Sequence, residues 1–139
     1  MKRFTKILSL ATLLVAAHWA GAQSAAPAVQ TLVSGIKIVH TRTGTGAMPL
    51  ATDKVKVHYR GTLPSGVEFD SSYTEGKPAV FPLNKVIRCW TQALQHMQVG
   101  GKATLSCPAE LAYGTKGAGD VIPPNTPLTF EVELLGIEK

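Results

Sequence analysis

The side chains that most often perform chemistry in proteins show no catalytic or metal-binding spacing in this 139-residue chain. His40, His58 and His96 lie far apart and lack the His-x-x-x-His spacing of a zinc site. Segment 44–46 reads Gly-Thr-Gly but lacks the third glycine and the following helix of a dinucleotide-binding loop. No Gly-x-Ser-x-Gly motif of serine hydrolases is present. We therefore expect no metal, no cofactor and no covalent nucleophile.

The two cysteines, Cys89 and Cys107, allow a single intramolecular pairing. A disulfide between them would close a short loop and stabilise the fold by about 3 kcal/mol in the chain-entropy model. Two separately buried small side chains are the alternative. A catalytic thiol is disfavoured, because there is no Cys-x-x-Cys spacing and no histidine at a motif-like offset. Export of the chain would favour the disulfide, because such bonds persist in oxidising compartments.

The first 22 residues have the pattern of a secretory signal peptide. Lys2, Arg3 and Lys6 form a positive start, residues 7–17 are an apolar run, and residues 20–22 supply the small side chains of a cleavage site. The run of 11 residues is shorter than the roughly 20 that span a membrane, so an uncleaved anchor is the weaker interpretation. We expect cleavage after Ala22, a periplasmic or secreted protein, and no membrane association after cleavage.

The composition of the remaining chain predicts one globular domain without a nucleic-acid partner. Removing the three basic residues of the signal segment from 14 basic and 9 acidic leaves a charge of +2, and no Lys/Arg run offers a phosphate-binding patch. Thirteen glycines and nine prolines favour a fold rich in strands and turns. Residues 23–34 are rich in Ala, Pro and Gln and predict a flexible tail before a domain at 35–139.

Alternation of apolar and polar side chains predicts several antiparallel strands. Residues 54–60 alternate cleanly, which is typical of a half-buried strand. A turn at 64–66 leads to a return strand at 67–69. Further extended segments are expected at 79–81, 102–107 and 127–138.

The spacing of apolar residues changes to three and four at 86–98, which predicts one amphipathic helix of about three turns, ended by Gly100 and Gly101. Segment 111–124 contains three glycines and two prolines, and its apolar ends suggest a flap over a pocket. The elements together predict an α+β fold, in which an antiparallel sheet of about five strands packs on a single short helix.

Five motifs in these elements resemble, in order, those of the FKBP-type peptidyl-prolyl cis/trans isomerases. They are Val57-His58-Tyr59-Arg60-Gly61, Phe69-Asp70-Ser71-Ser72, Val86-Ile87-Arg88-Cys89-Trp90, Leu111-Ala112-Tyr113-Gly114, and Ile122-Pro123-Pro124-Asn125 with the strand after it. The similarity runs from about Gly35 to Glu138. The resemblance implies a bent antiparallel sheet wrapped around a short helix, an apolar pocket between them, and isomerase activity on X–Pro bonds.

The resemblance also implies the residues of the pocket. Tyr59, Asp70 and Tyr113 are expected to act on the substrate. The remaining pocket residues are expected to be Phe69, Phe81, Val86, Ile87, Trp90, Val121, Ile122 and Phe130. Trp90 would form the floor, and the backbone N–H of Ile87 and the hydroxyl of Tyr113 would hold substrate carbonyls. The alternative interpretation, from the alternating pattern alone, is that the aromatic residues are ordinary core residues and that Asp70 makes an Asx turn.

Three features depart from the family pattern. Cys89 stands where the family usually has glycine, and a bond to Cys107 would account for it by linking the helix start to the neighbouring strand. The segment before Val86 is about two residues shorter than in eukaryotic single-domain members. Ala79 and Ala118 replace larger side chains at the pocket rim. These departures bear on substrate preference more than on activity.

The resemblance implies proline-containing unfolded or partly folded polypeptides as partners, rapamycin-type macrolides as inhibitors, and a monomer. A non-catalytic peptide-binding chaperone that uses the same pocket is the alternative. A surface factor linked to pathogenicity, as in some bacterial relatives, is disfavoured because the sequence shows no long helical dimerisation segment before the domain.

Overall fold

The structure, a computed structural model, describes residues 28–139. The predicted signal segment 1–22 and the first residues of the predicted tail lie outside the described residues. The elements, in chain order, are β1 (Ala28–Thr31), β2 (Lys37–Arg42), β3 (Lys54–Thr62), β4 (Glu68–Ser71), β5 (Ala79–Pro82), the 3₁₀ helix η1 (Leu83–Lys85), α1 (Arg88–Leu94), β6 (Lys102–Cys107), the 3₁₀ helix η2 (Ala109–Leu111) and β7 (Leu128–Glu138).

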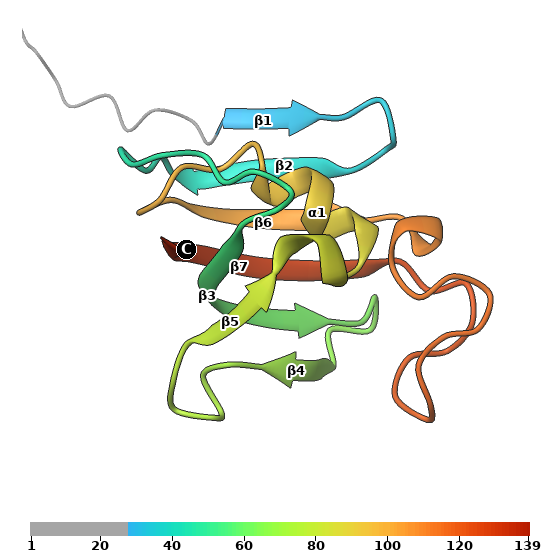
Figure 1. The fold of residues 1–139 in the computed structure, drawn as a ribbon. Coiled ribbons are helices and arrows are strands. Elements are labelled where there is room, and N and C mark those ends of the chain that lie inside the picture. Colours follow the sequence, from blue (N-terminus) through green and yellow to red (C-terminus); the bar gives the residue numbers. More distant parts are fainter. Residues whose placement is uncertain (1–27) are drawn as a thin grey trace, which may run out of the picture.

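The strands form one antiparallel sheet that curves around α1 (Figure 1). Its order is β1-β2-β6-β7-β3-β4, and β5 pairs with β3 beside this path. The predicted α+β fold with a bent antiparallel sheet around one short helix is confirmed. The sheet has seven strands rather than the expected five, because β1 and β2 extend it at one edge.

Strand β1 corrects the expectation of a flexible tail. Ala28 to Thr31 pair with β2 from Ala28↔His40 to Thr31↔Lys37. The turn that follows is closed by the Gly35 N–H, which donates to Leu32 O at 2.9 Å, and Gly35 has the positive φ of 93° that favours glycine. Residues 28–31 are therefore part of the sheet edge, because pairing with β2 satisfies backbone groups that an unpaired tail would leave to water.

The core lies between α1 and the concave face of the sheet. Alternate residues of the central strands point at the helix, as the period of two requires. The fully or almost fully buried side chains include Ile38, Val55, Val57, Leu105, Val132 and Leu134 from the sheet, and Trp90, Ala93, Leu94 and Met97 from the helical segment. Burying a side chain of this size contributes roughly 1.5–3 kcal/mol. Within residues 28–139, no helix has the length and apolarity of a transmembrane span.

The helix is shorter than the apolar spacing predicted. Val86 and Ile87 are extended, with ψ of 177° and 146°, so α1 begins at Arg88 rather than at residue 86. At the other end, Met97 N–H donates to Leu94 O, three residues earlier, which is 3₁₀ rather than α geometry. The apolar spacing continues beyond the helix because the flanking turns also direct side chains at the sheet.

The disulfide between Cys89 and Cys107 is confirmed. It joins the first turn of α1 to the end of β6, with a Cα–Cα distance of 5.7 Å and a sequence separation of 18 residues. Both cysteines are buried, with exposed fractions of 0% and 1%. Cys89 directly precedes Trp90, so the bond fixes the position of the helix start against the sheet.

Removing this cross-link should destabilise the fold. The double variant C89A/C107A is expected to lose about 3 kcal/mol of unfolding free energy, because its unfolded chain regains the freedom of the closed loop. Urea unfolding of the variant and of the reduced parent measures the loss. Equal unfolding midpoints for the parent with and without reductant would contradict a stabilising bond.

Candidate functional site

A cavity of about 350 Å³ opens between the helical segment and the strands on one side of the sheet. It is lined by Tyr59, Phe69, Asp70, Phe81, Lys85, Val86, Ile87, Trp90, Tyr113 and Phe130. These residues come from β3, β4, β5, η1, α1 and β7 and from the loop after η2, so they meet only in the folded chain. Apolar and aromatic side chains dominate the lining, as is usual for ligand pockets.

Five rings of the lining form one cluster centred on Trp90. The ring centroids of Tyr59, Phe81 and Phe130 lie 5.1, 5.7 and 5.4 Å from that of Trp90. Phe69 joins through Phe130 at 5.6 Å, and Tyr59 also meets Phe81 at 5.9 Å. All five contacts are edge-to-face, the arrangement that aromatic quadrupoles favour by about 0.5–1.5 kcal/mol each. The cluster therefore holds the floor and walls of the cavity in fixed orientations.

Gly61 makes room for two of these rings. A Cβ atom built on Gly61 would lie 2.5 Å from Phe69 Cζ and 2.8 Å from Phe130 Cε1, closer than real contacts allow. The missing side chain on β3 thus lets the rings of β4 and β7 meet across it. The glycine ends the strand motif that begins at Val57, and the sequence pattern alone did not reveal this steric reason for it.

The polar groups of the cavity are held at its mouth. The Tyr59 hydroxyl donates to Asp70 Oδ2 at 2.6 Å, and the Ser71 N–H donates to Asp70 Oδ1 at 2.9 Å. The Asp70 carboxylate does not accept the N–H of Ser72, as an Asx turn would require, because that N–H donates to Tyr59 O at 3.0 Å. Asp70 is therefore positioned toward Tyr59 rather than used to close a local turn.

Ser72 holds the backbone of Tyr59. Its buried hydroxyl oxygen accepts the Tyr59 N–H at 2.8 Å and lies 2.9 Å from Nδ1 of His58. The His58 ring stacks on Tyr73, with centroids 4.6 Å apart. The segment 70–73 therefore fixes Tyr59 at both its backbone and its hydroxyl, although the strand pattern predicts only that Tyr59 faces inward.

Burial raises the pKa of the Tyr59 hydroxyl well above its ordinary value of 10.0, and the hydrogen bond to Asp70 adds to the shift. Burial also raises the pKa of Tyr113, with a further contribution from the Asp70 charge. Both hydroxyls are therefore neutral hydrogen-bond donors at any physiological pH. A neutral donor can bind a carbonyl oxygen without bringing a charge into the cavity.

Three donors at the cavity have no acceptor among residues 28–139. They are the N–H of Ile87, the residue directly before α1, the Tyr113 hydroxyl, and the buried indole N–H of Trp90. The Trp90 donor is enclosed, since its residue is only 4% exposed. It is the one buried side-chain nitrogen or oxygen within residues 28–139 without a hydrogen-bond partner. The other two are free to donate to a ligand.

The cavity unites most of the residues that the resemblance implies. All of them except Val121 and Ile122 line it. Val121 is 53% exposed on the loop, and Ile122 is 3% exposed and belongs to the core cluster, where its carbonyl accepts the Ala118 N–H. The structure adds Lys85, which sequence reasoning missed because a single lysine after a proline-containing turn carries no signal. No group of three or more potential metal ligands occurs in the described part of the chain.

The raised pKa of Tyr59 predicts the alkaline behaviour of the protein. The native state holds this proton more tightly than the unfolded state, so the unfolding free energy should fall as pH rises above about 10. In a tyrosinate absorbance titration, the latest ionisation of the folded protein should be missing in Y59F. Identical high-pH titration curves for the parent and Y59F would contradict the assignment.

Comparison with known proteins places the chain in a family. The family model described as FKBP-type peptidyl-prolyl cis-trans isomerase matches residues 46–135. The "FKBP-type peptidyl-prolyl cis-trans isomerase FkpA" of Aeromonas hydrophila is 54% identical over 111 residues, which are 80% of this chain and 41% of that protein. The "FKBP-type 22 kDa peptidyl-prolyl cis-trans isomerase" of Escherichia coli is 51% identical over 78% of this chain and 53% of that protein. The chain thus spans about half the length of the curated relatives it matches.

A solved structure agrees over most of its own length. The crystal structure of a peptidyl-prolyl cis-trans isomerase from Pseudomonas syringae superposes with a TM-score of 0.76 at 45% identity, covering 83% of this chain and 84% of that one. The family model covers every element from β3 to most of β7, including all residues that line the cavity. The chain belongs to the FKBP-type peptidyl-prolyl cis-trans isomerase family.

Proposed function

We propose that this chain is a peptidyl-prolyl cis/trans isomerase that accelerates rotation about X–Pro bonds in exported polypeptides. The observation that supports the proposal is the cluster of rings around Trp90, which lines a cavity in a chain of this family. The cavity volume of about 350 Å³ lies at the lower end of the range of roughly 300–1,000 Å³ for small-ligand pockets. Such a volume suits a proline ring and its flanking peptide groups.

The reaction needs no nucleophile, metal or proton transfer. Amide resonance opposes rotation with a barrier of about 18–20 kcal/mol, and uncatalysed X–Pro isomerisation takes tens to hundreds of seconds. The rotated imide has less charge separation than the planar one, so an apolar cavity disfavours the planar form relative to the rotated form. Each difference of about 1.4 kcal/mol changes the rate tenfold.

The donors at the cavity would orient the peptide around the rotating bond. We expect the Ile87 N–H and the Tyr113 hydroxyl to bind the carbonyls that flank the proline. The Tyr59 wall is held by Asp70 at 2.6 Å, so it does not have to reorganise when the imide rotates. The edge-to-face rings would grip the proline ring, while the peptide ends leave through the mouth.

Loss of the Asp70 carboxylate should impair the reaction. D70N is expected to lower kcat/KM about tenfold, the effect of losing about 1.4 kcal/mol of transition-state stabilisation, because Tyr59 is no longer held by a charged acceptor. The measurement is the slow refolding phase of a protein whose folding is limited by prolyl isomerisation.

E138Q is the matched control for D70N, since Glu138 is an exposed acid at the end of β7, outside the cavity. Its rate should equal that of the parent, and a rapamycin-type macrolide should remove the acceleration by filling the cavity. If the parent leaves the slow phase unchanged, the isomerase proposal is wrong.

A non-catalytic chaperone is the second candidate, because Tyr113 and Val121 expose 40% and 53% of their surface on the loop after η2. Exposed apolar side chains of this kind can bind unfolded chains. Y113F and D70N separate the two functions. For an isomerase that also binds clients, both variants should lose rate acceleration and still suppress aggregation of an unfolded protein. Suppression of aggregation by a parent that lacks rate acceleration would support the chaperone alone.

We further propose that the chain is exported and processed. The signal pattern of residues 1–22 supports this, and so does the Cys89–Cys107 bond, which persists in oxidising compartments. Full-length chain expressed in Escherichia coli should be recovered from the periplasm with Gln23 as its first residue, as determined by N-terminal sequencing. Recovery of only the unprocessed chain from the cytoplasm would overturn the proposal.

A further inference from the structure

Lys85 brings a positive charge to the cavity. It is the last residue of η1 and lies directly before Val86 and Ile87, which also line the cavity. Among the lining residues it is the only basic one, and its side chain is exposed. A peptide that places a carbonyl on the Ile87 N–H would therefore pass within a few residues of this ammonium group.

The charge of Lys85 has no counter-ion in the described chain. The ion pairs found within residues 28–139 join Arg42 to Glu133, and Arg60 to Glu68 and Glu131. The acid of the cavity, Asp70, is instead held by the Tyr59 hydroxyl and the Ser71 N–H. The ammonium of Lys85 is therefore available to a ligand.

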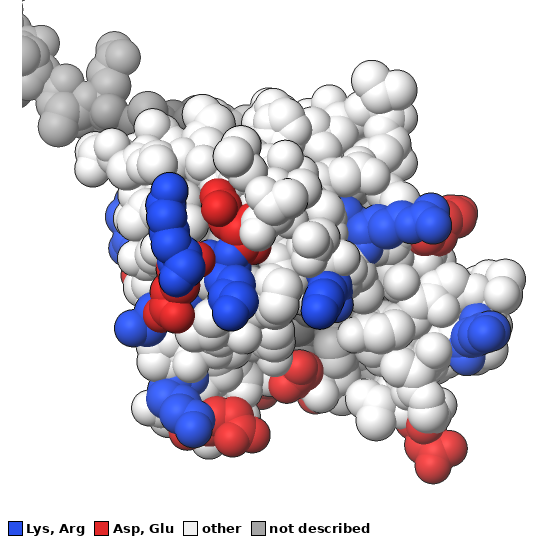
Figure 2. Space-filling view, in the orientation of Figure 1, with Lys and Arg blue, Asp and Glu red and all other residues white. Residues whose placement is uncertain are grey.

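The two charges of the cavity belong to different walls. Asp70 comes from β4 at one edge of the sheet, whereas Lys85 comes from the turn between β5 and α1 (Figure 1). Beyond the cavity, basic and acidic side chains are interspersed on this face without a patch of one sign (Figure 2). Within the cavity lining itself, Lys85 is the one basic residue and Asp70 the one acidic residue.

We infer that Lys85 gives the isomerase a preference for segments that carry an acidic side chain next to the proline. The inference rests on the proposed isomerase function and specifies its substrate class. An exposed ion pair is worth roughly 0.2–1 kcal/mol, so an acidic neighbour should improve kcat/KM about two- to five-fold over a neutral one. The contact lies away from the rotating bond and is equal in ground and transition states, so the gain should be in KM and not in kcat.

The experiment compares short peptides that differ in one residue beside the proline. Glu, Gln and Lys are placed before the proline in one series and after it in the other. Exchange spectroscopy by NMR measures catalysed isomerisation, and chemical-shift titration measures Kd for the same peptides. In at least one series, kcat/KM should be highest for the Glu peptide, lower for Gln and lowest for Lys. The difference in kcat/KM between the Glu and Lys peptides should shrink at high salt, because the screening length falls to about 3 Å at 1 M.

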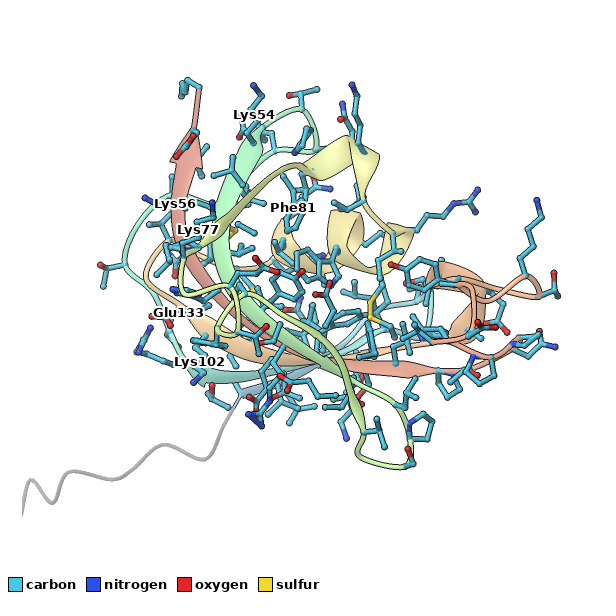
Figure 3. All side chains as sticks on the ribbon, turned by 90° about the horizontal axis from the view of Figure 1, so that it is seen from below. Lys54, Lys56, Lys77, Phe81, Lys102 and Glu133 are labelled. Carbon is cyan, nitrogen blue, oxygen red and sulfur yellow. A yellow bond between two sulfur atoms is a disulfide. The ribbon has the colours of Figure 1, made fainter. Side chains whose placement is uncertain are left out.

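Charge variants test whether Lys85 is the cause. K85Q should remove the preference between the Glu and Lys peptides, and K85E should reverse it. K56Q is the matched control, because it removes the same charge from the outer face of β3. Lys56 is exposed and does not line the cavity, and Figure 3 shows it apart from Phe81. K56Q should keep the preference of the parent.

The readouts separate this inference from the function it rests on. No acceleration of the Gln peptide by the parent would refute the isomerase function, while the Kd values would still report charge selection. Equal Kd and kcat/KM for the Glu and Lys peptides in both series would overturn the inference and leave the isomerase function intact. A preference that survives in K85E would also overturn it.

Discussion

The edge-to-face packing of Trp90 against rings from three strands is the interaction on which the rest of the site depends. Tyr59, Phe81 and Phe130 lie on β3, β5 and β7, and each touches the indole on α1. A single helix residue thereby links the curved sheet to the helix and closes the bottom of the cavity. The Cys89–Cys107 bond reinforces this link, because it ties the residue before Trp90 to β6.

The polar groups at the mouth of the cavity are hydrogen-bonded within the protein, whereas the polar group at its floor is not. At the floor, the indole N–H of Trp90 has no acceptor among residues 28–139. At the mouth, the exposed Asp70 accepts a hydrogen bond from the Tyr59 hydroxyl, and behind it the buried Ser72 hydroxyl accepts one from the Tyr59 backbone N–H. An aromatic floor and a preorganised polar mouth suit the proposed isomerisation, because without covalent chemistry the environment itself must favour the rotated imide.

The inferred preference for acidic segments would add a means of selection that the apolar floor lacks. In the proposed isomerase, the rings would bind the proline itself, so the inferred charge preference would act on the residues beside the proline. The Asp70 carboxylate accepts two hydrogen bonds from within the protein, whereas Lys85 takes part in no ion pair within residues 28–139. This asymmetry arises because β3 and β4 each supply one donor to Asp70, whereas no acidic side chain within residues 28–139 pairs with the exposed Lys85 of η1.

Local patterns in the sequence were sufficient to predict the strands β3 to β7, the α+β class and most of the cavity lining. Period-two alternation and the five ordered motifs can be recognised in the sequence without knowledge of the fold. The patterns did not predict β1 and β2, because the half-exposed residues of these strands show no clean alternation. They also placed the helix start too early, because Val86 and Ile87 have the apolar spacing of a helix although their backbone is extended. Tertiary structure alone decided that Ile122 belongs to the core, that Gly61 makes room for Phe69 and Phe130, and that Lys85 faces the cavity. Each of these depends on which segments approach one another in space, and the residue types in one segment do not carry that information.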